Sequence, residues 1–232
     1  MNVVLAELEI WHTRPLTPTR RISLGHMVLP VDPAPGFGGL LLGAVVARHV
    51  PEIDDDLVPD AHRLITQVRR GERVAQPRLR HRFQVDRHGL ACSRHRMIGR
   101  GDEFEFEFDT SGSPMQQVLG AIYALERLDL ASRAALETVF HKSMSWRGPL
   151  GAAFVSHLAG SKTTSLRSLA DPRAWALEVL GFAAGTKKPS RREVAGRFRQ
   201  RLREVHPDHG GDETVASVAI GDLAEARRIL SD

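Results

Sequence analysis

The chain has 232 residues, of which 42% are hydrophobic and 26% charged, and its formal net charge is +4. These values are ordinary for a soluble globular protein with one large domain or two small ones. A net charge this small does not by itself predict a nucleic-acid partner. The single cysteine, Cys92, excludes an intramolecular disulfide and a Cys-x-x-Cys metal site.

The apolar stretches are too short to cross a membrane. The longest run, Phe37 to Ala47, falls well short of the roughly 20 residues that a spanning helix needs. Residues 1–7 include an acid within an apolar stretch and have no basic leader, so we do not predict a signal peptide. We therefore expect a cytoplasmic protein without a membrane partner.

Residues 1–165 are predicted to form an α+β region, a small antiparallel sheet with helices. Alternation of apolar and polar residues, typical of a half-buried strand, is clearest from Glu103 to Phe108. Asp86 to Gly89 is typical of a hairpin turn, and Gly36 to Gly39 of a flexible joint. Strands are predicted at 3–11, 21–31, 79–85, 90–98 and 103–108, and helices at 40–49, 57–70, 114–128, 130–141 and 149–159.

Arginine is frequent between residues 60 and 100, which is compatible with a nucleic-acid surface. A structural alternative exists, because alternate residues from Arg78 to Arg82 are arginine and alternate residues from Glu103 to Glu107 are glutamate. If these strands are neighbours, the charges pair across the sheet. Aromatic residues for base stacking are scarce there, so we favour ion pairing. The role of this region stays open between client binding, dimerisation and tethering.

Four residues in this region, His81, His88, Cys92 and His95, could suggest a metal site. On a strand, however, His88 and Cys92 face one way and His95 the other, because side chains alternate. The convergence that a zinc site needs is therefore not expected. We also find no Ser-His-Asp or paired-carboxylate arrangement, so we predict no cofactor and no enzyme.

The remaining residues form a separate helical pattern after a Ser/Thr/Gly-rich stretch at 160–169, which is predicted to be a linker. Ser190 and Glu193 have the spacing of a capping box, which opens a helix to about Val205. A last helix is predicted over 213–230, with Val218 among its apolar positions. Facing apolar stripes on these two helices predict an antiparallel helical hairpin.

The sequence His206-Pro207-Asp208 stands between the two helices. Because Pro207 has no amide donor and cannot continue a helix, the chain must turn there. The surface of the preceding helix is strongly basic, with arginines at positions Arg191, Arg192, Arg197, Arg199, Arg201 and Arg203.

In this order, the features of residues 171–232 resemble a J domain of the DnaJ-like co-chaperones. Ala176 to Phe182 is similar to the family's first helix and its Leu-Gly end, the basic helix contains Phe198, and 223–232 is similar to the closing helix. Three positions depart from the family's pattern. His209 stands where a basic residue is common, Arg227 where an aromatic is common, and Arg201 where leucine is usual.

The resemblance implies a co-chaperone that docks on a DnaK-type heat-shock ATPase, stimulates its ATP hydrolysis and so traps an unknown client. It also implies the docking residues: His206, Pro207 and Asp208 in the loop, with Arg191, Arg192, Arg197, Arg199 and Arg203 on the basic helix. Arginines would attract an acidic groove over a distance, and Asp208 would fix the register by a charge-assisted hydrogen bond. The alternative is an assembly or nucleic-acid-binding protein whose J module is degenerate and only tethers.

Overall fold

The computed structural model forms two compact units, Met1–Ala159 and Gly160–Asp232. Each has its own hydrophobic core, and the protein is α+β overall. None of the described helices has the length and apolar character needed to cross a membrane. The structure describes residues 2–14, 20–72, 81–109, 111–160, 165–183, 185–205 and 213–231.

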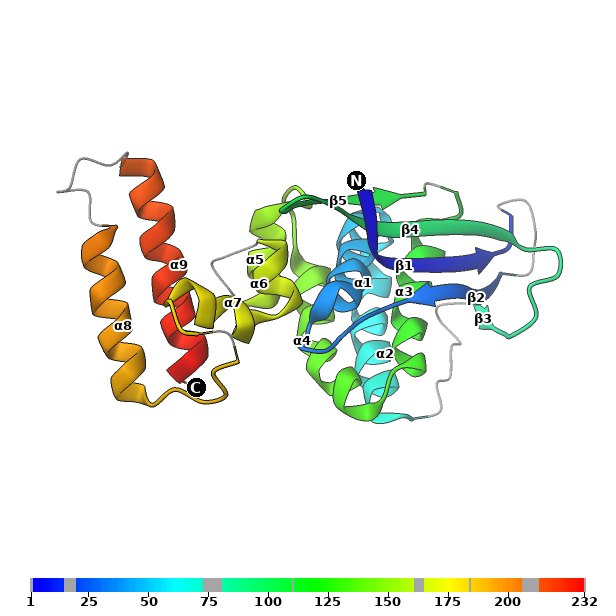
Figure 1. Cartoon of the computed structure of the whole chain (residues 1–232). Helices are drawn as coiled ribbons and strands as arrows, with labels where there is room; N and C mark the ends of the chain where they lie inside the picture. Colours follow the sequence, from blue (N-terminus) through cyan, green and yellow to red (C-terminus); the bar gives the residue numbers. More distant parts are fainter. Residues whose placement is uncertain are drawn as a thin grey trace. The chain divides into compact units, whose positions relative to one another are not determined.

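The N-terminal unit contains a five-stranded sheet in the order β3-β2-β1-β4-β5 (Figure 1). The central strand, β1, pairs antiparallel with both β2 and β4, and β5 pairs antiparallel with β4. Because β3 pairs parallel with β2, the sheet is mixed, and the prediction of an antiparallel sheet is wrong at that edge. The strands are β1 Asn2–His12, β2 Arg21–Val28, β3 Arg82–Phe83, β4 Ala91–Arg100 and β5 Glu103–Phe108.

Helix α1 lies at the centre of this unit, where it contacts the sheet through β1 and β4 and three further helices, α3, α4 and α5. Its apolar side chains from Leu40 to Val46 have no exposed surface, which explains the apolar run noted in the sequence. The helices are α1 Gly36–His49, α2 Val58–Arg70, α3 Pro114–Ala124, α4 Leu130–Ser145 and α5 Ala152–Ala159, with 3-10 turns η1 Val50–Glu52, η2 Asp55–Leu57 and η3 Leu125–Arg127.

The stretch Gly36 to Gly39 is the first turn of α1, so the prediction of a flexible joint is wrong. The reason is close packing, which only glycine permits at positions 38 and 39. A methyl group on Gly39 would lie 2.4 Å from Cδ2 of Leu136 in α4, and one on Gly38 would lie 2.6 Å from the backbone of Leu29. Tertiary contact therefore outweighs the low helix propensity of glycine.

The predicted hairpin between residues 79–85 and 90–98 is also wrong. Asp86 to Gly89 does turn, since the Asp86 carboxylate accepts a hydrogen bond from the His88 amide at 3.0 Å. The two flanking strands nevertheless do not pair, because β1 and β2 lie between β3 and β4. Instead Phe83 stacks on the buried Tyr123 ring at 4.4 Å, which holds β3 against β2.

A buried polar network joins β1, β4 and α3. His12 Nε2 lies 2.8 Å from the Ser93 hydroxyl, and the Gln117 amide donates to that hydroxyl at 2.9 Å. The Gln117 carbonyl lies 2.9 Å from Nε2 of His95. Ser93, His95 and Gln117 have no exposed surface, so the hydroxyl, the amide and Nε2 of His95 satisfy one another within the core, whereas Nδ1 of His95 has no hydrogen-bond partner among the described residues.

The C-terminal unit is helical in its described part. Helix α7 packs on α9, and α8 and α9 lie side by side and run in opposite directions (Figure 1). The predicted linker at 160–169 is wrong where α6 begins, because Ser165 caps that helix by accepting a hydrogen bond from the Ser168 amide at 3.2 Å; residues 161–164 lie outside the described residues. The helices are α6 Leu166–Ala170, α7 Pro172–Val179, α8 Arg191–Glu204 and α9 Glu213–Ser231.

We predict that acid weakens the N-terminal unit through its buried histidines. His49 is only 6% exposed, and burial, together with the nearby His95, lowers its pKa from 6.5 to about 4. His49 therefore binds a proton more readily in the unfolded chain than in the folded one. Its contribution to the free energy of unfolding is complete above about pH 6.5 and is lost as the pH falls towards 4. A shift of this size corresponds to about 3 kcal/mol.

Urea unfolding measured from pH 7 to pH 5 checks this prediction. In the wild type, the free energy of unfolding should decrease as the pH is lowered. His49→Gln should make this dependence of the unfolding free energy on pH shallower. The matched control, His88→Gln, changes an exposed histidine and should leave the slope unchanged. Equal slopes in wild type and His49→Gln would contradict the prediction.

Candidate partner-docking site

The three loop residues predicted to make the central contact, His206, Pro207 and Asp208, lie outside the described residues. Their flanking helices are described. Helix α8 ends at Glu204 and α9 begins at Glu213, so the geometry of the site is set by these two helices and by the side chains that they present.

The start of α8 is fixed by the predicted capping box, which is confirmed. The Ser190 hydroxyl accepts a hydrogen bond from the Glu193 amide at 3.3 Å, and the Glu193 carboxylate accepts one from the Ser190 amide at 2.7 Å. Hydrogen bonds from the Ser190 side chain and backbone lower the pKa of Glu193. Because the helix begins at a defined residue, the direction of every later side chain on α8 is defined as well.

Helix α8 and its neighbours share one apolar core. Val194 is buried, and Phe198 and Val205 are partly buried against the same cluster. The partners in that cluster come from α7 and α9: Trp175, Ala176, Leu180, Leu223, Ala226 and Leu230. The predicted apolar face of α9 is wrong at Val218, which is 63% exposed, because it lies off the face that carries Leu223, Ala226 and Leu230.

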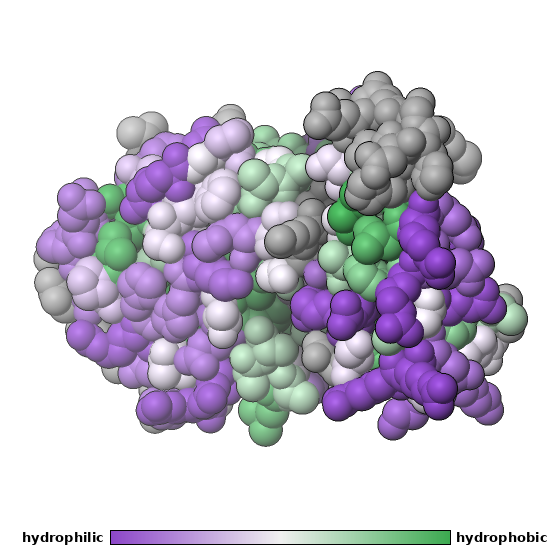
Figure 2. Space-filling model, turned by 90° about the vertical axis from the view of Figure 1, so that its left-hand side faces the viewer, coloured by the Kyte–Doolittle hydropathy of each residue, from purple (hydrophilic) through white to green (hydrophobic). Residues whose placement is uncertain are grey.

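Three of the predicted docking arginines share the surface of α8 that faces away from this core. Arg192, Arg199 and Arg203 are separated by seven and four residues, which places them on one side of a helix. The Arg203 guanidinium donates to the Arg199 backbone carbonyl at 3.3 Å, and all three side chains are exposed. Within the described part of the chain, no carboxylate pairs with them. Figure 2 shows strongly hydrophilic residues gathered on this side of the molecule.

Two other arginines of α8 turn towards the segment that follows α7. The Arg197 guanidinium carbon lies 5.7 Å from the centre of the Phe182 ring. Arg201 pairs with Glu204 at 3.0 Å, and a methyl group on Gly181 would lie 2.8 Å from the Arg201 guanidinium. The basic residues of α8 therefore form two faces. Arg191 occupies the first position of the helix, where it is exposed.

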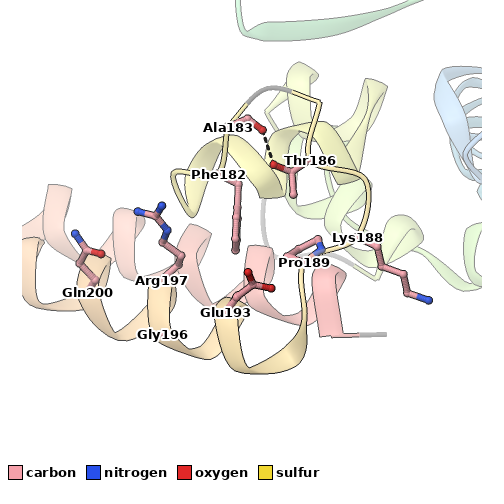
Figure 3. Close-up of a pocket in the computed structure, with 9 residues that line it drawn as sticks. All are labelled: Phe182, Ala183, Thr186, Lys188, Pro189, Glu193, Gly196, Arg197 and Gln200. Carbon is pink, nitrogen blue, oxygen red and sulfur yellow. Dashed lines mark hydrogen bonds between the residues drawn. The ribbon is translucent and has the colours of Figure 1, made fainter.

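An open cleft of about 580 Å³ lies between residues 182–189 and α8 (Figure 3). Phe182 forms an aromatic wall, Arg197 and Gln200 project from α8, and the Lys188 amine points away from the cleft. The Thr186 hydroxyl donates to the Ala183 carbonyl at 2.7 Å, which ties the loop to itself. Sequence reasoning missed this cleft because Phe182 and Arg197 meet only in the folded chain. Its lining residues are Phe182, Ala183, Thr186, Lys188, Pro189, Glu193, Gly196, Arg197 and Gln200.

Arg227, which replaces an aromatic residue of the J-domain pattern, also has an aromatic partner. Its guanidinium carbon lies 5.0 Å from the centre of the Phe198 ring. A cation over a ring face is attracted by the ring's quadrupole. The planar guanidinium therefore packs against Phe198 from α9, as an aromatic side chain at this position could.

Two arginines of strand β4 in the N-terminal unit are placed differently from those of α8. Arg94 pairs with Glu9 at 2.6 Å, and Arg96 with Glu7 at 2.8 Å, across strands β4 and β1. The predicted pairing of the 78–82 arginines with the 103–107 glutamates is wrong for Arg82, because β3 and β5 are opposite edges of the sheet. Arg78 and Arg80 lie outside the described residues.

The described residues contain no group of three or more His, Cys, Asp or Glu side chains that could hold a metal ion. Comparison with protein families, curated proteins and solved structures finds no match to this chain.

We predict that Arg227 stabilises the C-terminal unit through Phe198. Arg227→Ala should lower the free energy of unfolding of this unit by about 1 kcal/mol, because the cation–ring contact is lost. Arg227→Tyr should retain most of the stability, because a second ring can stack on Phe198. Amide hydrogen exchange of α8 and α9, measured by mass spectrometry, reports on this unit separately from the other.

The matched control is Arg192→Ala, which removes an exposed arginine that has no ring partner among the described residues. Arg192→Ala should accelerate amide exchange in α8 and α9 much less than Arg227→Ala does. The stacking role of Arg227 fails if both alanine variants accelerate exchange equally.

Proposed function

We propose that this protein is a J-domain co-chaperone that docks on a DnaK-type heat-shock ATPase and stimulates its ATP hydrolysis. The observation that carries the proposal is the exposed face of Arg192, Arg199 and Arg203, which has no carboxylate partner among the described residues and lies on the helix that immediately precedes His206-Pro207-Asp208. The J-type fold of residues 171–232 is part of the same proposal.

The charge of this face supports a docking role. Arginine side chains that are not neutralised internally create a positive potential that extends about 10 Å at moderate ionic strength. Such a field attracts an acidic surface and orients it during the encounter. The contact should therefore form fast and should weaken as salt is added.

The departures from the J-domain pattern are compatible with this role. Arg201 pairs with Glu204 and lies close to Gly181, and Arg227 lies over Phe198. Neither substitution removes a cation from the face that carries Arg192. The loop residue Asp208 would then supply the directional contact, because a carboxylate can accept short charge-assisted hydrogen bonds from a partner.

In this proposal the protein performs no bond chemistry of its own. ATP is hydrolysed in the partner, and the docked J module favours the partner's hydrolysis-competent state. The N-terminal unit would bring the client.

We predict that the loop is essential for stimulation. Asp208→Asn and His206→Gln should each abolish the increase in single-turnover ATP hydrolysis by the cognate DnaK-type chaperone. The matched control, Asp102→Asn, removes a carboxylate from an exposed turn of the N-terminal unit and should stimulate like the wild type. A folded wild-type chain that gives no stimulation would falsify the proposal. Binding that is unaffected by Asp208→Asn, without stimulation by either protein, would instead favour the tethering alternative.

We also predict that the arginine face sets affinity and its salt dependence. Replacing Arg192, Arg199 and Arg203 by glutamine should raise the concentration for half-maximal stimulation by about tenfold or more, since each lost charge weakens the electrostatic attraction. The dependence on salt should become shallower. The maximal stimulation, measured at saturating co-chaperone, should change by a smaller factor than the concentration for half-maximal stimulation.

The control for this variant carries the same change of charge at three exposed arginines of the N-terminal unit, Arg14, Arg20 and Arg127. It should keep the wild-type affinity and salt dependence. If both triple variants lose affinity equally, net charge rather than the α8 face is responsible, and this part of the proposal is wrong.

A further inference from the structure

Strand β5 is an open edge of the sheet. It pairs only with β4, and no strand pairs with its other side within the described residues. The Asp109 amide donates to the Arg94 carbonyl at 3.2 Å. Because backbone groups alternate in direction along a strand, the amides and carbonyls of Phe104, Phe106 and Phe108 point away from β4, towards the open side.

The opposite edge differs. Strand β3 has only two residues, Arg82 and Phe83, and a short edge strand offers little backbone for pairing. Strand β5 has six residues, so it presents the longer row of free backbone groups. An exposed row of this kind is a template for an added strand.

The side chains of β5 that face the helices form an aromatic row. The ring centres of Phe104 and Phe106 are 5.7 Å apart, and those of Phe106 and Phe108 are 6.0 Å apart. Phe106 also contacts the fully buried Phe154 of α5, at 6.4 Å. All three rings of the row remain partly exposed. A strand added beside β5 would place alternate side chains next to these rings, so apolar residues fit there.

The other face of β5 carries three glutamates. Glu105 pairs with Arg100 at 2.5 Å and Glu107 lies 3.7 Å from Arg96, yet these glutamate side chains remain 41% and 50% exposed. Glu103 is exposed and has no cation partner among the described residues. A second copy of β5 paired antiparallel at this edge would bring glutamate opposite glutamate, which is unfavourable. Basic residues on an added strand would instead meet these carboxylates.

We propose that the open edge of β5 binds an extended peptide segment in which basic residues alternate with apolar ones, by adding it to the sheet as a further strand. The backbone of Phe104, Phe106 and Phe108 supplies the hydrogen bonds. The aromatic row selects the apolar residues and the glutamates select the basic ones. This proposal uses no residue of α8, and it does not depend on whether the protein stimulates an ATPase.

The first test is a titration of the full chain against a fluorescent peptide of alternating arginine and leucine, followed by anisotropy. A peptide of alternating glutamate and leucine serves as the opposite-charge probe and should not bind. The double variant Glu103→Lys, Glu107→Lys should weaken binding of the basic peptide by about tenfold or more and should gain binding of the acidic one, because cross-strand charge pairs become like charges.

The control, Glu52→Lys with Glu72→Lys, makes the same change of charge at two exposed positions away from β5 and should bind the basic peptide like the wild type. If the two double variants lose binding equally, the glutamates of β5 do not select the peptide and the proposal is wrong. Absence of binding to the wild type also overturns it.

The second test needs no variant. Amide hydrogen exchange by NMR should slow at Phe104, Phe106 and Phe108 when the basic peptide binds, while Glu105 and Glu107, whose amides already point to β4, should change little. Binding without this alternating protection would place the peptide elsewhere and overturn the proposal. Self-association of the free chain at neutral pH through the same three amides would assign the edge to a second copy instead.

Discussion

The N-terminal unit depends on one constraint, which is that helix α1 has almost no polar surface and must be covered on every side. Leu40, Leu41 and Leu42 have no exposed surface although they point in different directions around the helix. The sheet covers one side through β1 and β4, and α3, α4 and α5 cover the others. Small residues make this possible, since a methyl group on Gly43 would lie 2.7 Å from the Ser143 hydroxyl of α4. The helices thus approach closely enough to exclude water from α1.

The cover of α1 also determines which surfaces of the sheet remain free. The helices occupy one face, so the charged side chains of β1, β4 and β5 project from the other, where Glu7, Glu9, Arg94 and Arg96 form ion pairs. The Glu7 and Glu9 side chains of these pairs are only 14% and 10% exposed, and each carboxylate is paired with an arginine of β4. What stays available for a partner is the backbone at the edge beside Phe106, together with the half-exposed carboxylates of β5.

Local patterns predicted the elements whose residues interact with near neighbours in sequence. The strand at 103–108 follows from strict alternation, and the start of α8 from the Ser190–Glu193 pair, whose two hydrogen bonds span three residues. The predictions that were wrong concern residues whose contacts lie far away in the sequence. Gly39 is part of a helix that packs closely against Leu136. Strand β3 does not form the predicted hairpin, because Phe83 stacks on Tyr123. The cleft between Phe182 and Arg197 exists only after α7 and α8 are folded together. No short-range pattern contains those contacts.

The contrast between the two groups of arginines explains why composition could not identify a partner. Arg94 of β4 lies 2.6 Å from a carboxylate of the same unit, so most of its charge is cancelled before any other molecule approaches. Arg192 and Arg199 lie on a helix whose own acids are engaged elsewhere: Glu193 holds the capping box and Glu204 holds Arg201. Their charge is therefore available to a partner, although both groups count equally towards the net charge. Attraction of an acidic surface requires this unpaired kind of arginine, and Arg192 and Arg199 supply it on the helix that precedes Asp208 in the sequence.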